Sequence, residues 1–118
     1  MGNDGIREII NTLCDASGFD EMFGVMVLDT FLKQSLEIVS ETKTELKCLN
    51  LDSHEKIANN MHKLKGSSGN VRAYALMEMA KTAELLGKDK RTEELNEQIE
   101  LMDILLQKYQ SELANIQL

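Results

Sequence analysis

The chain has 118 residues, 42% of them hydrophobic and 28% charged, and its 13 Lys and Arg against 20 Asp and Glu give a net charge of −7 at pH 7. No run approaches the roughly 18 apolar residues of a membrane span, no signal-peptide hydrophobic region opens the chain, and two cysteines are too few for a disulfide framework. We expect one cytoplasmic, monomeric domain over residues 1–118 with its own core and with neither a membrane nor a nucleic-acid partner.

Apolar residues recur at helical spacing in five segments, which turn-forming residues separate. The predicted helices cover residues 5–15, 20–48, 53–67, 71–86 and 92–116. Gly18 stops the first helix and Asp20 is the N-cap of the second. Residues 68–70, Ser-Gly-Asn, form a predicted turn, and Gly87-Lys88 is the predicted stop of the fourth helix.

No strand pattern competes with these helices, and the connections between them are short. Short connections place consecutive helices antiparallel to one another. The sequence therefore predicts an all-α fold, an up-down-up-down antiparallel four-helix bundle with the short first helix across one end.

His62 is the most reactive side chain, and helical geometry places it on an exposed face. At about 100° per residue it lies about 130° from the middle of the buried stripe of its helix. That stripe comprises Ile57, Met61 and Leu64. The neighbours of His62 on the helix surface are Ala58, Asn59, Lys65 and Gly66. A glycine inside a helix costs roughly 1 kcal/mol relative to alanine, and clearance for a docking partner would explain Gly66.

The charge around His62 is positive although the chain is acidic. No Asp or Glu occurs between Glu55 and Glu78. The cations of this window are Lys56, Lys63, Lys65 and Arg72. A local positive field suits an arriving anion, and phosphate is the obvious candidate. An exposed histidine beside a lysine is also a common surface pair, so charge and exposure do not decide between the two interpretations.

The motif His62-x-Leu64-Lys65-Gly66-Ser67-Ser68, followed by Ala73 and Leu76, resembles the histidine-containing phosphotransfer (HPt) domains of two-component phosphorelays. The likeness covers nearly the whole chain and implies a single HPt domain over residues 1–118. It implies that His62 accepts a phosphoryl group from a phosphoaspartyl receiver domain, or from a histidine kinase, and passes it to another receiver. It also implies that Lys65 neutralises the phosphoryl oxygens.

We expect a docking surface for the receiver around this motif. Its predicted members are Ala58, Asn59, Lys63, Gly66, Ser67, Gly69 and Arg72. Gly66 would let the receiver's active-site loops approach, and Lys63 would steer the partner. The family usually has a Gly-Ala pair where this chain has Arg72-Ala73, which leaves open a partner choice or docking angle different from that of its relatives.

An imidazole nitrogen can accept a phosphoryl group near neutral pH and release it again. The chain has no P-loop and no kinase-type Gly-rich strand, so we expect a phosphocarrier without ATP-binding or enzymatic machinery. We expect no cofactor or metal on this chain, because Mg²⁺ would come with the receiver domain. The expected partner is the receiver domain of a response regulator, of a hybrid sensor histidine kinase, or both.

Two other functions stay open at this point. A helical adaptor that carries no phosphate would keep its function when His62 is changed to Gln. The dimerisation domain of a histidine kinase usually has an acid and then a proline after its histidine, whereas Lys63 follows here and the chain has no proline. His54 is expected to be a solvated residue at a helix start and not a metal ligand, since a metal site would require two or three further ligands nearby.

Overall fold

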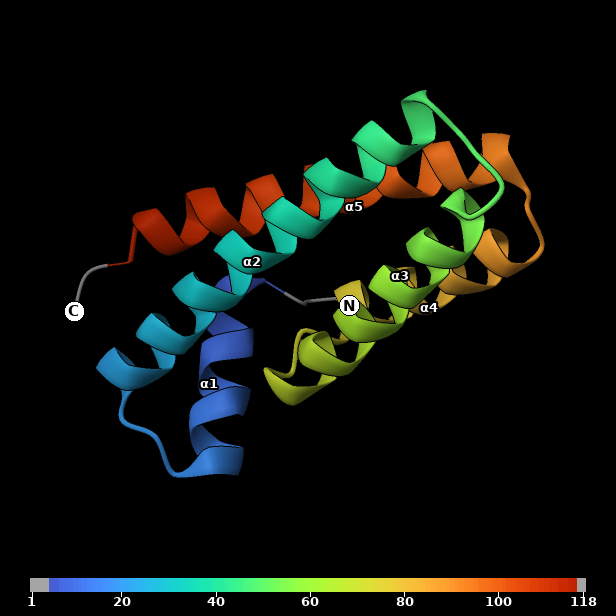
Figure 1. Ribbon diagram of the computed structural model, residues 1–118. Coiled ribbons are helices and arrows are strands. Elements are labelled where there is room, and N and C mark those ends of the chain that lie inside the picture. The colour runs from blue at the N-terminus through green and yellow to red at the C-terminus, as the bar shows by residue number, and fades with distance from the viewer. Residues whose placement is uncertain (1–4, 117–118) are drawn as a thin grey trace.

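The computed structural model describes residues 5–116, which form five α-helices joined by short connections (Figure 1). The helices are α1 (Ile6–Ser17), α2 (Glu21–Lys47), α3 (Ser53–Asn70), α4 (Tyr74–Lys88) and α5 (Thr92–Ala114). No strand occurs between residues 5 and 116. The prediction of an all-α fold is therefore confirmed.

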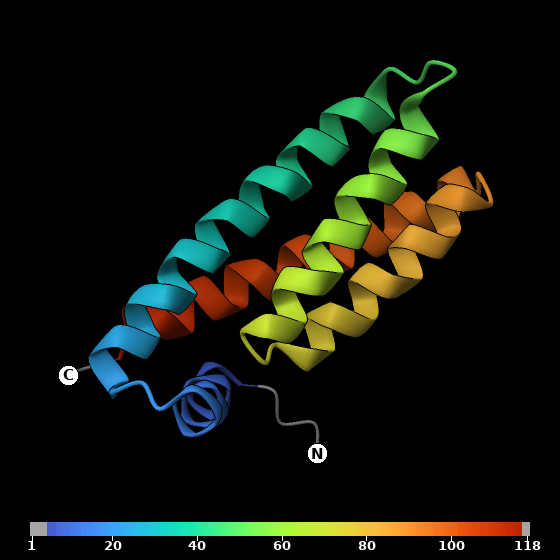
Figure 2. The ribbon, with the colours of Figure 1, turned by 60° about the horizontal axis from the view of Figure 1, so that its bottom comes forward.

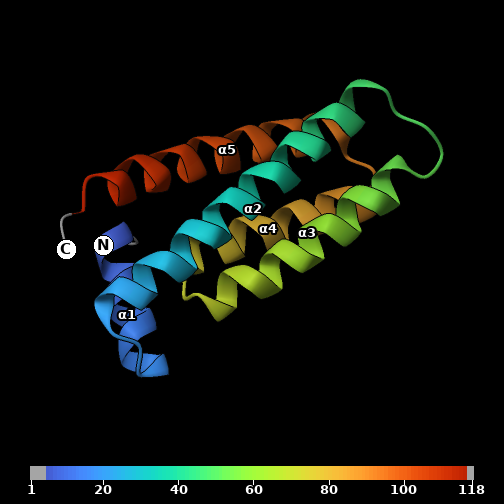
Figure 3. The ribbon, with the colours of Figure 1, turned by 60° about the vertical axis from the view of Figure 1, so that its left-hand side comes forward.

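Four of the helices enclose a common core. α2 packs against α3 and α5, and α4 packs against the same two helices (Figure 3). Apart from Ala58, the buried apolar side chains belong to one contiguous cluster, to which all five helices contribute. The molecule is elongated along the helices, with extents of 46 × 25 × 23 Å.

The short first helix closes one end of this core. α2 and α5 have 27 and 23 residues, whereas α3 and α4 have 18 and 15, so each helix of the first pair is about 8 to 18 Å longer than those of the second. α1 lies across the end that α3 and α4 do not reach and contacts α2 and α5 (Figures 1 and 2). Its buried side chains cover the core there and are Ile6, Ile9, Ile10 and Leu13.

Two predicted helix boundaries are confirmed by their hydrogen bonds and backbone angles. The Asp20 side chain accepts a hydrogen bond of 2.8 Å from the backbone N–H of Phe23, as an N-cap does. Gly18 follows α1 with a φ of 71°, in the left-handed region that glycine adopts without steric cost.

The predicted turn at residues 68–70 and the predicted helix start at residue 71 are wrong. α3 continues through the predicted turn to Asn70, because Ser68 and Val71 extend the buried stripe of Leu64 at helical spacing. α4 accordingly begins at Tyr74. α4 ends at Lys88, at the predicted stop Gly87-Lys88. Gly87 lies in its last turn, where an added Cβ would be 3.4 Å from the Cβ of Ala58. Its lack of a side chain allows α3 and α4 to approach closely.

The end of α3 places a non-glycine residue in a left-handed conformation. Arg72 has a φ of 70°, its N–H donates to the Gly69 carbonyl at 3.1 Å, and the Ala73 N–H donates to the Ser68 carbonyl at 2.9 Å. These two bonds define a Schellman motif, in which the left-handed position is usually glycine. The Nε of Arg72 is moreover buried without a hydrogen-bond partner. Arg72 therefore stands where the backbone favours glycine.

We expect Arg72→Gly to unfold with a free energy about 1 kcal/mol higher than Arg72→Ala, because both variants lose the side chain but only glycine avoids the Cβ clash at positive φ. Urea denaturation of the two variants and of the wild-type chain measures this difference. Equal stabilities of the two variants would show that the backbone at position 72 carries no strain.

Candidate functional site

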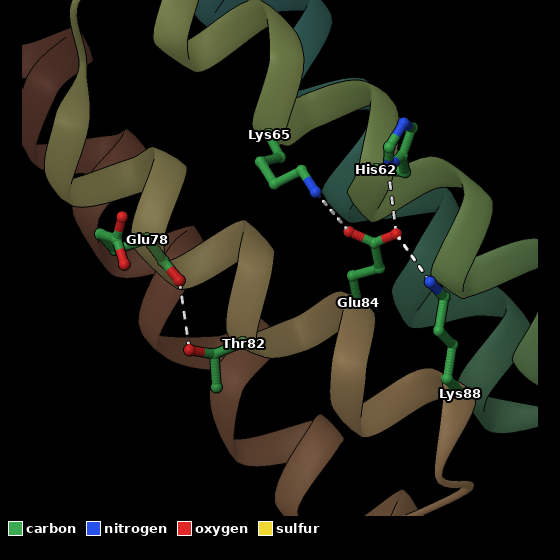
Figure 4. A network of polar contacts seen from close by, with 6 residues as sticks. All are labelled: His62, Lys65, Glu78, Thr82, Glu84 and Lys88. Atoms are coloured by element: carbon green, nitrogen blue, oxygen red, sulfur yellow. Dashed lines mark hydrogen bonds and ion pairs between the residues drawn. The ribbon is translucent and has the colours of Figure 1, made fainter.

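His62 projects from the exposed side of α3 toward solvent. Its side chain is 66% exposed, whereas Met61, directly before it, and Leu64, two residues after it, are fully buried on the opposite side of the helix. The Nδ1 atom of the ring lies 3.0 Å from Oε2 of Glu84, which belongs to α4 (Figure 4). This contact fixes one nitrogen of the ring and leaves the other edge free.

Glu84 is the centre of the site. Its side chain is only 8% exposed, and both of its carboxylate oxygens are engaged (Figure 4). Lys65 Nζ donates to Oε1 at 3.0 Å, and Lys88 Nζ donates to Oε2 at 3.2 Å. One buried carboxylate thus accepts hydrogen bonds from two lysines while it contacts the imidazole.

These contacts decide the charge of Glu84. The hydrogen bond from Lys65, with those from Lys88 and His62, lowers the pKa of Glu84 to about 2, although its burial acts in the opposite direction. The carboxylate is therefore ionised at neutral pH. Buried charges persist in proteins when they are paired and hydrogen-bonded, as this one is.

The ionised carboxylate also decides the tautomer of His62. A carboxylate can only accept hydrogen bonds, so the proton of a neutral His62 ring must lie on Nδ1. The lone pair is then on Nε2, at the exposed edge of the ring. Any positive charge that develops on the ring faces the negative charge of Glu84. The arrangement presents an oriented nucleophile to a reactant that arrives from solvent.

Glu84 was not among the predicted site residues. The sequence around His62 lacks acids, and the carboxylate comes from another helix, 22 positions later. A signal was nevertheless present, because Glu84 lies four residues after the buried Ala80 and next to the buried Ala83. A charged residue at the edge of an apolar helix stripe, four residues before Lys88, indicates a buried polar contact.

The structure places most of the predicted docking residues around His62. Asn59, Lys63 and Gly66 are exposed on α3 beside it, and Ser67 is half-buried one turn later. A Cβ added at Gly66 would meet no atom within 4 Å. Nothing within the described fold therefore requires a glycine at that position.

The structure corrects the predictions for two side chains, Ala58 and His54, and gives another explanation for the glycine at position 69. Ala58 is only 4% exposed and packs against Gly87, so its assignment to the docking surface is wrong: α4 covers that side of α3. Gly69 is half-buried, and an added Cβ would lie 3.1 Å from Met77 Sδ, so packing explains this glycine. His54 lies at the start of α3 as predicted but is half-buried, with Nε2 at 2.9 Å from Thr92 Oγ1.

Between residues 5 and 116, no group of three or more His, Cys, Asp or Glu side chains is placed to hold a metal ion. Within the same range, no helix combines the length and the apolar character that a membrane crossing requires.

Comparison with known families adds an independent observation. A family model described as Hpt domain matches residues 26–116, more than three quarters of the chain. The chain belongs to the Hpt domain family. Hpt domains act in phosphotransfer within two-component signalling, as phosphocarriers that interact with receiver domains and histidine kinases. The resemblance inferred from the motif around His62 is thereby confirmed. Comparisons with curated proteins and with solved structures find no significant match.

The family match covers most of the helices but not the first one. It includes His62, Lys65 and Glu84, and it begins inside α2 at Met26. α1 and the first turn of α2, with Met22 and Phe23, precede it. α1 and the first turn of α2 are thus described by the structure and not by the family match.

Proposed function

We propose that this Hpt domain is a phosphorelay carrier that accepts a phosphoryl group on Nε2 of His62 from a phosphoaspartyl receiver domain, or from a histidine kinase, and passes it to another receiver. The observation that carries the proposal is the exposed imidazole whose Nδ1 is held by the buried, ionised Glu84. We also infer that the bundle has the up-down-up-down topology, which the short connections between its helices favour.

The transfer step balances without an added proton donor or acceptor. The Nε2 lone pair attacks the phosphorus atom, an N–P bond forms, and the P–O bond to the receiver's aspartate breaks with its electron pair going to that carboxylate. The ring keeps its proton on Nδ1, and Glu84 compensates the positive charge that the ring acquires. The reverse sequence hands the phosphoryl group to the next receiver.

Lys65 is proposed to neutralise the phosphoryl oxygens. It lies on the turn of α3 after His62, and its Nζ is held at 3.0 Å by Glu84 in a side chain that is 32% exposed. A cation that is tethered yet accessible can contact an arriving phosphoryl group without a large rearrangement. We assign docking of the receiver to Asn59, Lys63, Gly66 and Ser67.

The remaining chemistry is assigned to the partner. Phosphoryl transfer depends on positioning, charge neutralisation and metal ions, and the receiver domain would bring its aspartyl phosphate and Mg²⁺. We propose that this chain contributes no metal, cofactor or ATP-dependent activity of its own and binds neither nucleic acid nor membrane. We propose a cytoplasmic monomer, because a single chain encloses its own core and receiver domains act in the cytoplasm.

The test is the chemical stability of the transferred phosphate. The wild-type chain is incubated with a panel of ³²P-phosphorylated receiver domains, and the label that reaches it is treated with acid or alkali. We expect a label that acid removes and alkali leaves, as for a phosphoramidate bond. An acid-stable label, or no label from any receiver that is itself phosphorylated, would overturn the proposal.

Gly66→Ala is expected to stabilise the domain and to slow its phosphorylation by a receiver. The added Cβ meets no atom within 4 Å, so the variant should gain about 1 kcal/mol of helix stability. It would also add a methyl group where the receiver approaches His62. Denaturation curves and transfer rates measure the two effects. A variant that is more stable and equally fast would show that no partner closely approaches Gly66.

A further inference from the structure

Lys88 is the second lysine that contacts Glu84, and it differs from Lys65 in the helix that carries it. Lys88 belongs to α4, four residues after Glu84, and its Nζ lies 3.2 Å from Oε2. Lys65 reaches Oε1 from α3, at 3.0 Å. The two ammonium groups approach the carboxylate from opposite sides (Figure 4). Because Glu84 and Lys88 lie one turn apart on the same helix, their contact does not depend on the position of α3.

Lys88 and His62 share one oxygen of the carboxylate. Nδ1 of His62 lies 3.0 Å from Oε2, the atom that Lys88 also contacts. Lys65 is bonded to the other oxygen, Oε1. Lys65 can therefore leave Glu84 without breaking either contact at Oε2. The oxygen that orients the imidazole keeps a cation beside it throughout.

The proposed transfer step draws one cation away from Glu84, since Lys65 turns toward the phosphoryl oxygens. Glu84 is only 8% exposed, and a buried carboxylate without a cationic partner is costly. The hydrogen bond from Lys65, with those from Lys88 and His62, lowers the pKa of Glu84 to about 2 against the effect of burial. With Lys88 in place, Glu84 keeps an ionic partner after Lys65 has turned away.

We propose that Lys88 is a positioning residue for phosphotransfer, which holds the Glu84 carboxylate against His62 while Lys65 turns to the phosphoryl group. This inference rests on the proposed function. Lys65 acts on the phosphoryl group itself, whereas Lys88 acts on the reaction only through Glu84. The Lys88 side chain is 60% exposed, so its replacement should cost the fold little.

Lys88→Met tests this role, with Lys108→Met as its matched control. Lys108 is also 60% exposed and pairs with an acid four residues away. It lies on α5, however, and the described part of the chain shows no contact between α5 and α3. We expect Lys88→Met to lower kcat for a phosphorylated receiver about fivefold, the size expected for a partly exposed ion pair, with KM unchanged. Lys88→Arg keeps the charge and should restore the rate, and Lys108→Met should match the wild type. A wild-type kcat in Lys88→Met would overturn the inference.

The double variant Glu84→Gln/Lys88→Met separates an action through Glu84 from a direct one. Without the carboxylate, Lys88 has nothing to hold, so the double variant should transfer as fast as Glu84→Gln alone. A further loss of about fivefold in the double variant would show that Lys88 acts on the phosphoryl group itself, and would contradict the inference.

A small-molecule donor distinguishes positioning from docking. Phosphoramidate needs no docking surface, so Lys88→Met should slow its reaction with His62 by the same factor as the reaction with the receiver. If Lys88→Met raises only the KM for the receiver and reacts with phosphoramidate at the wild-type rate, Lys88 is a docking residue and the inference fails while the proposed function stands. If neither donor labels the wild type, the proposed function fails and the inference with it. Lys88→Gln repeats the test should Lys88→Met not fold.

Discussion

Replacing His62 with glutamine is expected to reduce transfer from a phosphorylated receiver to below detection. The variant loses the Nε2 lone pair, and an amide is not a nucleophile toward phosphorus near neutral pH. The fold should persist, because the His62 side chain is 66% exposed and a glutamine can still donate a hydrogen bond to Glu84. Its stability should stay within about 0.5 kcal/mol of the wild type, as for other surface substitutions. Transfer of ³²P and thermal denaturation measure the two properties.

His54→Gln is the matched control, since it makes the same chemical change at the other histidine. His54 lies near the start of α3 and contacts Thr92, away from the Glu84 cluster. This variant should therefore be phosphorylated at the wild-type rate. Label that persists in His62→Gln and disappears in His54→Gln would reassign the acceptor. Unlabelled wild-type protein whose partner binding survives His62→Gln would instead favour a helical adaptor.

The acceptor could be found from the sequence because its signals are local. The motif from His62 to Ser68 is contiguous, and the exposed position of His62 follows from the spacing of Ile57, Met61 and Leu64 on one helix. The helices themselves were predictable for the same reason. Periodicity reports which face of a helix is buried, and it needs no knowledge of the other helices.

What the sequence did not reveal depends on how α3 and α4 pack. Ala58 appeared beside His62 on a single helix, but its contact with Gly87 puts it under α4. The same packing brings Glu84 under His62 from 22 positions away. Periodicity leaves the relative rotation and register of two helices undefined, so it showed neither the covering of Ala58 nor that Glu84 would contact His62. The packing contact of Gly87 with Ala58 was hidden for the same reason, although the helix does end at Gly87-Lys88 as predicted.

The Glu84→Gln substitution is expected to lower the rate of phosphotransfer about ten- to hundredfold, by analogy with residues that orient metal-binding histidines. The new side-chain amide could both donate and accept hydrogen bonds, so it would no longer force the proton onto Nδ1 of His62. It would also leave Lys65 and Lys88 without their counter-ion. Glu84 is buried and forms no part of the docking surface, so the slower phosphotransfer should appear as a lower kcat more than as a higher KM. If the variant transfers at the wild-type rate, Glu84 does not orient His62 for phosphotransfer and only contributes to packing.

The same substitution has a pH signature, because the pKa of Glu84 is lowered from 4.5 to about 2 in the folded chain. A group with a depressed pKa stabilises the fold above its unfolded pKa and loses that contribution as the pH falls through its folded pKa. The wild type should therefore exceed Glu84→Gln in unfolding free energy at pH 7, and the excess should shrink between pH 4.5 and about 2. We expect the excess in unfolding free energy to be about 1 to 2 kcal/mol. The full pKa shift, at about 1.4 kcal/mol per pKa unit, would correspond to more, but solvent screens the exposed Lys88 and weakens its interaction with Glu84.

Glu84→Asp separates the charge of this residue from its position. It keeps a carboxylate but draws it back by one methylene, so it cannot reach both His62 and Lys65 at the 3.0 Å of the wild type without a shift of α4. If positioning dominates, this variant should transfer as slowly as Glu84→Gln while it keeps part of the pH-dependent stability. If charge alone matters, both its rate and its pH profile should follow the wild type. Urea denaturation across pH 2–7 and single-turnover transfer kinetics on the three proteins distinguish these outcomes.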